Sequence, residues 1–280
     1  MPPGPIKETG RRKSWSPERY FFAWLLLTFL GPVVPAIAAE DVIIPSLEAG
    51  RQLQLPGVLH KPSGGGPFPA VVMLVGCGGY AGGGPNAEHQ SSWAEKLVEW
   101  GYVALQVDSY SPRGPSLICD YAGSLTISHD AFSAKSCLST LPFVDPENIA
   151  VVGWSMGGMA VLKIIDRYFR HKAVSPFKAG VAFYPLCRPV YQPDTPLLLM
   201  TGKKDDVCHA SLAEDLKKKY TDRNWKPELS MTIYPNAYHS FDMEGLTLDT
   251  SGHHFQYDPQ AAADAIVRTK DFLEKHTGAR

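Results

Sequence analysis

The chain has 280 residues, of which 44% are hydrophobic, and a formal net charge of −1 at pH 7. This length and composition allow one substantial hydrophobic core, in one large α/β domain or in two small ones. The near-neutral charge leaves no basic excess that would attract a nucleic acid, so no such partner is expected.

The N-terminal segment, residues 1–39, has the organisation of a secretory signal peptide. The basic residues Arg11, Arg12, Lys13 and Arg19 precede an apolar run over residues 20–39, which closes on the small-residue pattern A-I-A. We therefore expect cleavage near Ala39 or Glu40, export to the periplasm or the medium, and no stable membrane association afterwards. An uncleaved anchor is the alternative, because the run is just long enough to span a bilayer. Two prolines interrupt the run and favour cleavage.

Residues 40–280 are expected to form a single domain in which strands alternate with helices. After an early strand within 51–60, apolar strand patterns occur at 70–75, 102–107, 149–153, 179–184, 196–202 and 229–234. Helical patterns occur at 86–101, 129–141, about 156–169, 210–221 and 260–276. Continuous apolar strands separated by helices are typical of a mostly parallel sheet covered on both faces. The predicted fold class is therefore α/β, with a mostly parallel central sheet and helices on both faces.

Five cysteines lie in this region: Cys77, Cys119, Cys137, Cys187 and Cys208. Export would allow disulfides to persist, and the odd count leaves at least one thiol free or intermolecular. Cys187 and Cys208 follow successive strands, so a disulfide between them is one hypothesis and two separate core residues are the other. No cysteine pair has the spacing of zinc ligands and the nine histidines are scattered, so we expect no metal site.

The segment AVVGWSMGGMA, residues 150–160, places a serine between glycines where a strand meets a helix. The pattern G-x-S-x-G is weak evidence by itself, but a strand before it and a helix after it are what a nucleophile elbow requires. In that geometry the hydroxyl of Ser155 projects above the carboxyl edge of the sheet, and the N–H group of Met156 points where an oxyanion would form. The alternative is a small-residue crossing of strand and helix in which the serine has no chemical role.

A serine nucleophile needs a base and an acid that orients the base, and in this architecture both follow later in the chain, the acid first. Asp205 and Asp206 follow one apolar strand, and His239 follows the next. Each lies at the carboxyl end of a strand, where open α/β sheets place their chemistry. His253 and His254 are weaker candidates for the base, because no strand pattern leads into them.

A second N–H group for an oxyanion usually comes from the loop after an earlier strand, and LVGCGGY, residues 74–80, fits that place. The backbone amide of Cys77 or Gly78 could supply it. We favour a reading in which the side chain of Cys77 has no role of its own; a free reactive thiol and a disulfide partner are the alternatives. Arg113, in the loop DSYSPRG, could pair with a substrate carboxylate or could only hold the shape of its own loop. Gly78 and Trp154 are further candidates for substrate contact.

The motifs GCGG, DSYSPRG, VDPENIAVVGWSMGG, GKKDD and YPNAYHSFD run nearly from end to end over residues 55–275. In this order they resemble the dienelactone hydrolase family of α/β-hydrolases. The resemblance implies that Asp205, three residues after the glycine of G-x-x-D, is the acid and that His239 is the base. The founding enzymes carry a cysteine where this chain has Ser155, and a glutamate where it has Gly76. The chain is thus similar to the serine-bearing branch, and dienelactone is not implied as its substrate.

The sequence therefore predicts an exported serine hydrolase that cleaves a small carboxylic ester or lactone and requires no cofactor. Ser155 would attack the carbonyl carbon, His239 would take its proton, and Asp205 would orient the imidazole. An acyltransferase or a peptidase on the same fold is the alternative among enzymes, and a non-catalytic exported binding protein is the alternative outside them. Two loops, 109–124 and 240–258, are expected to shape the substrate site, the second as a partial lid.

Overall fold

The computed structural model describes residues 38–48, 53–80, 83–114, 119–172 and 174–278. The predicted signal peptide, and the membrane anchor that is its alternative, therefore lie almost wholly outside the described residues. Within the described ranges, no helix is long and apolar enough to cross a membrane. All the elements named below belong to one unit of the chain, which runs from Ala36 to Arg280.

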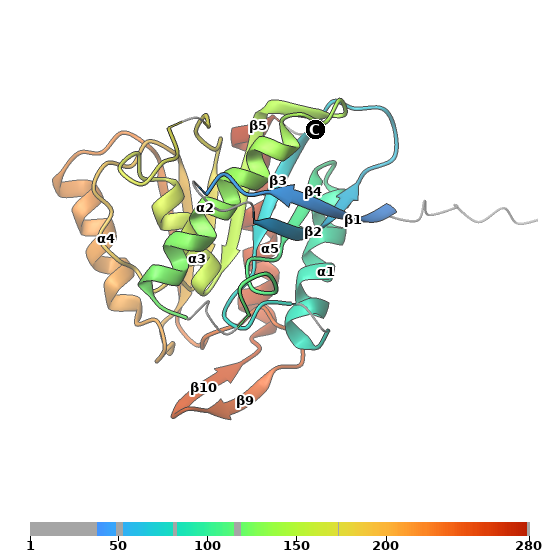
Figure 1. Cartoon of the computed structure of the whole chain (residues 1–280). Helices are drawn as coiled ribbons and strands as arrows, with labels where there is room; N and C mark the ends of the chain where they lie inside the picture. Colours follow the sequence, from blue (N-terminus) through green and yellow to red (C-terminus); the bar gives the residue numbers. More distant parts are fainter. Residues whose placement is uncertain (1–37, 49–52, 81–82, 115–118, 173, 279–280) are drawn as a thin grey trace, which may run out of the picture. The chain divides into compact units, whose positions relative to one another are not determined.

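Eight strands form the central sheet. They are β1 (Ala38–Pro45), β2 (Gln54–Lys61), β3 (Phe68–Leu74), β4 (Val103–Val107), β5 (Val144–Trp154), β6 (Gly180–Phe183), β7 (Leu197–Gly202) and β8 (Leu229–Tyr234). Their order across the sheet is β1-β2-β4-β3-β5-β6-β7-β8 (Figure 1). The pairs β1 with β2 and β2 with β4 are antiparallel, and the other neighbours run parallel. The mostly parallel sheet predicted from the sequence is confirmed.

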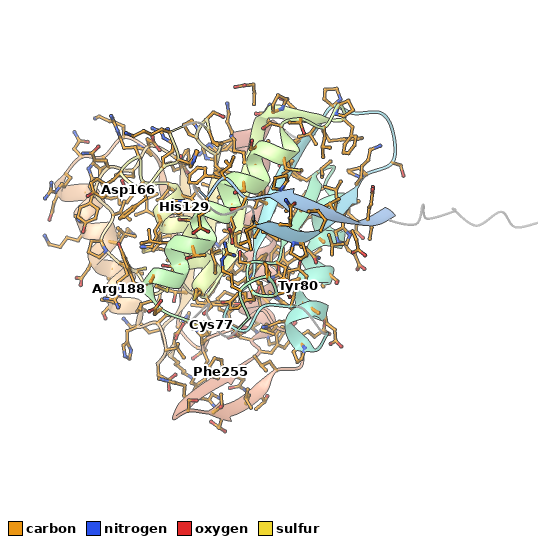
Figure 2. All side chains as sticks on the ribbon, viewed as in Figure 1. Cys77, Tyr80, His129, Asp166, Arg188 and Phe255 are labelled. Atoms are coloured by element: carbon orange, nitrogen blue, oxygen red, sulfur yellow. A yellow bond between two sulfur atoms is a disulfide. The ribbon has the colours of Figure 1, made fainter. Side chains whose placement is uncertain are left out.

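The described residues form five helices, of which the first four lie between strands of the sheet and the last follows them. They are α1 (Pro85–Glu99), α2 (Tyr121–Leu138), α3 (Met156–Ile164), α4 (Ala210–Asp222) and α5 (Pro259–Thr277). Helix α2 begins earlier than the apolar pattern predicts, because the side chain of Asp120 caps its first turn by accepting a backbone N–H at 2.8 Å. Helix α3 ends earlier than predicted. There the buried carboxylate of Asp166, labelled in Figure 2, accepts a hydrogen bond from the backbone N–H group of Tyr168. In a continuing helix this N–H group would instead bond a backbone carbonyl oxygen of the preceding turn.

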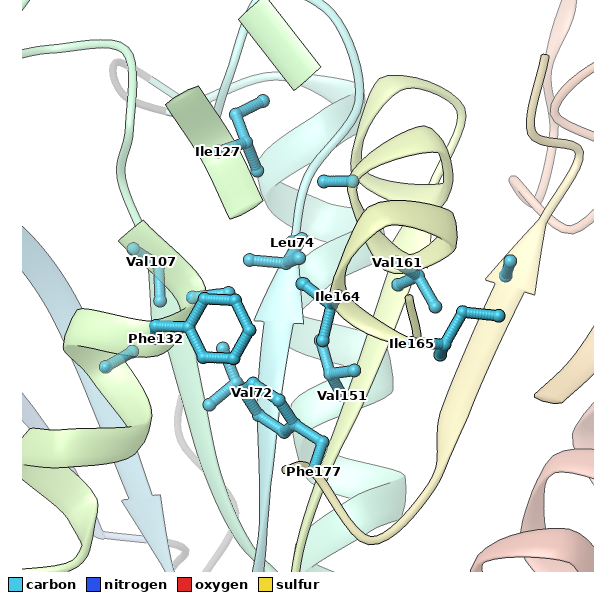
Figure 3. Close-up of a cluster of buried hydrophobic side chains, with 14 of the residues drawn as sticks. Val72, Leu74, Val107, Ile127, Phe132, Val151, Val161, Ile164, Ile165 and Phe177 are labelled. Carbon is cyan, nitrogen blue, oxygen red and sulfur yellow. The ribbon is translucent and has the colours of Figure 1, made fainter. Parts of the chain in front are cut away.

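The two faces of the sheet carry separate hydrophobic clusters. One cluster contains side chains of α2, α3 and α4, and the other contains side chains of α1 and α5. Because successive side chains of a strand point to opposite faces, β3 supplies both: Val72 and Leu74 belong to the first cluster, Val71 and Met73 to the second. Figure 3 shows the first cluster, with the two β3 side chains beside those of α2 and α3. Burial on both faces explains why the strands read as continuous apolar runs.

Three strands have no counterpart in the sequence prediction. Strand β1 pairs along its whole length with β2. Strands β9 (Thr247–Thr250) and β10 (His253–Gln256) form an antiparallel hairpin outside the main sheet, seen at the bottom of Figure 1. An isolated bridge between His239 and Phe255 joins this hairpin to the loop after β8. The segment expected to act as a partial lid is thus an ordered ribbon held against the predicted base.

Candidate active site

Ser155 lies at the turn between β5 and α3, with φ of 51° and ψ of −112°. Residues other than glycine rarely adopt such a backbone, and strain of this kind occurs at functional turns. The turn also needs its glycines. A Cβ on Gly157 would lie 2.1 Å from the carbonyl oxygen of Leu74, and a Cβ on Gly153 would lie 2.3 Å from the carbonyl oxygen of Gly157. Strand and helix therefore approach as closely as the G-x-S-x-G pattern predicts.

Ser155, His239 and Asp205 form one chain of hydrogen bonds. The Nε2 atom of His239 lies 2.9 Å from Oγ of Ser155, and its Nδ1 atom lies 2.8 Å from Oδ2 of Asp205. Asp205 and His239 are 2% and 3% exposed. A carboxylate can only accept hydrogen bonds, so Nδ1 carries a proton and Nε2 is free to accept the proton of the serine hydroxyl.

The second oxygen of Asp205 fixes its orientation. Oδ1 accepts the backbone N–H groups of Val207 and Cys208 at 2.9 and 2.7 Å, which leaves Oδ2 for His239. The neighbouring Asp206 points elsewhere: its carboxylate is 43% exposed and lies 3.4 Å from the imidazole of His253. The structure thus joins His239 to Asp205 and not to Asp206.

The alternative bases also lie outside this chain of hydrogen bonds. His253 and His254 both belong to β10. The first pairs with Asp206, and the second lies 2.8 Å from Asp249 within the hairpin. Neither is bonded to Ser155.

The loop after β3 lies directly against the serine. A Cβ on Gly76 would be 3.3 Å from Cβ of Ser155, so a larger residue at this position would crowd the serine. Cys77 and Gly78, whose amides are the candidates, follow in the same loop and line the same cavity. Met156 is the first residue of α3, where backbone N–H groups have no acceptor within the helix. These amides remain our proposed oxyanion donors.

The side chain of Cys77 is not incidental, contrary to the reading favoured from the sequence. It forms a disulfide with Cys119, with the two Cα atoms 5.6 Å apart. The bond ties the loop beside Ser155 to the segment that precedes α2. The loop is therefore anchored at the point where an oxyanion would have to be bound.

Of the two hypotheses for Cys187 and Cys208, the structure supports the second: both are separate buried free thiols, and no disulfide joins them. Burial raises the pKa of the Cys187 thiol to about 12 and raises that of Cys208 as well. Cys208 forms, with Asp205 and His239, the one group among the described residues that is close enough to hold a metal ion. A protonated thiol is a poor ligand, and the other two side chains already bond each other, so this arrangement does not favour a metal.

Arg113 is not available to a substrate. Its guanidinium donates two hydrogen bonds to Asp130, at 2.8 and 2.9 Å, and one to the carbonyl oxygen of Ser109 at 2.8 Å. Burial raises the pKa of Asp130, although the guanidinium beside it acts in the opposite direction. Of the two roles considered for Arg113, the structure therefore supports the structural one, in which its side chain holds the shape of its own loop. The assignment of Arg113 to substrate binding is corrected.

A cavity of about 460 Å³ opens at Ser155. Its wall is formed by the loop 75–79, the first turns of α1, the ends of β5 and β6, and residues of the segment 239–255. Gly78 and Trp154, the further candidates for substrate contact, belong to this wall. Cys77 and Phe255, labelled in Figure 2, approach it from the loop and from the hairpin. The described residues of the loop 109–124, which was expected to shape the site, do not line it.

The sequence reasoning assigns no role to Asp242, a second buried acid beside the site. Its Oδ2 atom accepts from Nε2 of His89 at 2.9 Å, Nε1 of Trp93 at 3.1 Å and Nε1 of Trp154 at 2.9 Å, and its Oδ1 atom accepts from the hydroxyl of Tyr184 at 2.7 Å. Burial alone would raise the pKa of Asp242, but the charge of His89 and these hydrogen bonds bring it below its ordinary value. Only the motif YHSFD, which contains Asp242, could have drawn attention to it.

Tyr184 lies between this acid and His239. Burial and the carboxylate of Asp242 raise the pKa of its phenol well above the ordinary value, so the hydroxyl remains a donor. The ring centroid of Tyr184 lies 4.7 Å from that of His239. The backbone φ of Tyr184, 36°, is rare for a residue other than glycine. Ser155, Tyr184 and Ser240 all have positive φ and all line the cavity, which places backbone strain at the site.

The mostly parallel sheet, with a serine at a strand-to-helix turn and its acid and histidine after later strands, defines an α/β-hydrolase fold. A sequence model of the dienelactone hydrolase family matches residues 55–277, and the chain belongs to this family. The resemblance seen in the motifs is thereby confirmed. It places the chain in a family of hydrolases.

Known relatives agree with this assignment. The chain is 24% identical over 247 residues to a Synechocystis protein assigned as a carboxymethylenebutenolidase, a match that covers 80% of this chain and 93% of that protein. Its fold resembles that of a dienelactone hydrolase assigned in Klebsiella pneumoniae, with a TM-score of 0.66, 20% identity, and coverage of 86% and 99%. It also resembles a dienelactone hydrolase-like promiscuous phosphotriesterase from metagenomic libraries, with a TM-score of 0.64, 18% identity, and coverage of 85% and 99%. At these identities the structural similarities show the fold alone.

Proposed function

We propose that this protein is a serine hydrolase that cleaves a carboxylic ester or a lactone through an acyl-enzyme on Ser155. The observation that carries the proposal is the chain of hydrogen bonds from Ser155 through His239 to Asp205, at the wall of a cavity. A serine hydroxyl is a weak nucleophile at neutral pH, and a buried imidazole held by a carboxylate is the arrangement that activates it.

In the proposed reaction, His239 takes the hydroxyl proton as Ser155 attacks the substrate carbonyl carbon. Negative charge develops on the carbonyl oxygen, where the N–H groups of Met156 and of Cys77 or Gly78 stabilise it. His239 then returns the proton to the leaving alcohol. A water molecule that loses a proton to His239 attacks the acyl-enzyme and releases the acid. The proposed sequence requires no cofactor.

Labelling with a fluorophosphonate tests this proposal. Peptide mapping should find the label on Ser155, and Ser155→Ala should remove labelling and lower kcat for p-nitrophenyl esters by about 10⁴-fold to 10⁶-fold. Ser111→Ala is a matched control, because this serine is exposed and outside the cavity wall. Full esterase activity in Ser155→Ala would reject the mechanism. Transfer of the acyl group to an added alcohol, with no release of free acid, would favour an acyltransferase.

We also infer that residues 1–39 are a cleaved signal peptide and that the protein acts outside the cytoplasm. The basic, apolar and small-residue order of this segment supports the inference, and the Cys77–Cys119 disulfide favours an oxidising compartment. Removal of residues 1–38 changes the net charge from −1 to about −4, because five basic and two acidic residues are lost. N-terminal sequencing of exported protein should find Ala39 or Glu40. Membrane-bound protein that retains Met1 would support the anchor instead.

A further inference from the structure

A second cavity, of about 660 Å³, adjoins the cavity at Ser155. It lies between α1, α5 and the segment 242–248, and the proposed reaction does not use it. The two cavities share five wall residues, which are Pro85, His89, Met243, Leu246 and Leu248. A molecule held at Ser155 therefore reaches the second cavity by passing these side chains.

The second cavity leads away from the serine along α1. Side chains one turn apart on this helix line it from Pro85 to Lys96, a distance of about 16 Å along the helix axis. Ala262 and Ile266 of α5 line its other side, and neither belongs to the wall of the first cavity. A space of this length suits an extended chain.

The wall of the second cavity is apolar inside and charged at its rim. Apolar side chains come from all three segments, among them Trp93, which is 3% exposed, and the half-buried Ile266. The charged residues lie farther out: Glu88 and Glu244 are exposed, and Lys96 is half-buried. An uncharged, apolar occupant therefore fits the interior.

Asp242 is the buried acid in the described part of this wall. Its two oxygens accept hydrogen bonds from four side chains, one of which is His89. These bonds form whether the imidazole is neutral or charged, because Nε2, which faces the carboxylate, carries a proton in both states. An apolar occupant would therefore leave no carboxylate oxygen of Asp242 without a partner.

Gln90 gives the first cavity a different character. Its side chain is 1% exposed and belongs to the wall of the first cavity, but not to that of the second. Neither its amide oxygen nor its amide nitrogen bonds any described residue. A buried amide without a partner is costly beside an apolar group, so the space around Gln90 favours a polar occupant. The ester group suits the first cavity, and a hydrocarbon chain suits the second.

We propose that the second cavity binds a long apolar limb of the ester that reacts at Ser155. The inference rests on the proposed function and names its substrate class, which is uncharged esters with an extended hydrocarbon chain. Leu246 and Leu248 border the passage between the cavities. Leu248 is 47% exposed and Leu246 is half-buried, so the limb would cover apolar surface that water now contacts.

Two series of esters test the proposal. p-Nitrophenyl alkanoates from acetate to decanoate lengthen the acyl side, and alkyl acetates from ethyl to decyl lengthen the alcohol side. The readout is kcat/KM divided by the rate of alkaline hydrolysis, measured below the concentration at which each ester aggregates. In one series it should rise by up to about fourfold for each methylene group that enters the second cavity, and by at least about tenfold in all. The series that rises shows which side of the ester carries the limb.

Ile266→Trp should fill the second cavity from α5, where this side chain does not line the first cavity. In the series that rises, the ratio of the octanoate or octyl ester to the shortest ester should fall by about tenfold. Hydrolysis of p-nitrophenyl acetate should stay within about twofold of wild type, which shows that the site is folded. Val267→Trp is the matched control, because the neighbouring side chain is 56% exposed and lines neither cavity, so the ratio should keep its wild-type value.

A wild-type ratio near one in both series would overturn the proposal. An unchanged ratio in folded Ile266→Trp, or an equal fall in Val267→Trp, would also overturn it. If Ile266→Trp does not fold, Ser92→Phe replaces it and fills the second cavity from α1; if neither variant folds, the wild-type series decide alone. Labelling of Ser155 and hydrolysis of acetate without a rise would refute the limb site only. Absence of labelling and of all ester hydrolysis would instead remove the proposed function itself.

Discussion

Replacement of Asp205 by Asn should inactivate the protein by imposing the wrong tautomer on His239. Oδ1 of Asp205 accepts two backbone N–H groups, at 2.9 and 2.7 Å, so the carbonyl oxygen of an asparagine must occupy that place. The NH₂ group then replaces Oδ2, 2.8 Å from Nδ1 of His239, and donates to it. The imidazole proton must move to Nε2, which can no longer accept the proton of Ser155.

The expected loss in kcat is about 10⁴-fold, the size found for the same change in another Ser-His-Asp triad, or about 5 kcal/mol of transition-state stabilisation. The assay is the hydrolysis of a p-nitrophenyl ester under saturating conditions, with thermal unfolding to show that the variant is folded. Asp206→Asn is the control: its exposed side chain does not touch His239, so kcat should stay within about threefold of wild type. A loss below about tenfold in folded Asp205→Asn, or an equal loss in Asp206→Asn, would refute the reasoning.

Three further changes probe the surroundings of the site. Cys119→Ser should lower the free energy of unfolding by up to about 4 kcal/mol in urea titrations, because its disulfide with Cys77 closes a loop with a sequence separation of 42; reduced wild type should behave like the variant, and an unchanged midpoint would contradict the bond. Arg113→Met should cost about 3 to 5 kcal/mol of stability by leaving the buried carboxylate of Asp130 unpaired. It should affect acidic and neutral esters equally, so a rise in KM confined to acidic esters would restore a role in binding. Gly157→Ala should abolish soluble, active protein, because its Cβ would lie 2.1 Å from a backbone carbonyl oxygen; a wild-type melting temperature would show that the turn is less tightly packed.

The sheet and the proposed triad could be predicted because their signals are local. Apolar runs and helical periodicity repeat every two or 3.6 residues, so β3 to β8 and most helix bounds follow from short stretches of sequence. Ser155 is recognisable from five residues and the two elements that flank them. His239 and the pair Asp205 and Asp206 are candidates because parallel strands all end at one edge of the sheet, so residues that follow such strands lie near one another. The family resemblance then selects Asp205.

Other features depend on which distant segments meet. Cys77 bonds Cys119 and not one of the other thiols, and Arg113 bonds Asp130 on α2 and not a substrate. Spacing along the chain cannot predict such pairs, because the distance between two side chains is set by the packing of the elements that carry them. The hairpin of β9 and β10 escaped prediction for a related reason: its strands are four residues long and partly exposed, so they have little apolar pattern.

Asp242 marks the limit most clearly. In the sequence it is one acidic residue in the polar motif YHSFD, and acidic residues are usually solvated. Only the tertiary structure surrounds it with His89, two tryptophans and a tyrosine, drawn from three separate parts of the chain. The sequence alone determined most strands and helices in their order and the candidates for nucleophile, base and acid, because each rests on a local pattern, and the family resemblance chose Asp205 over Asp206. The folded chain decided which polar groups lie around them, because burial and hydrogen bonding arise only when distant segments pack together.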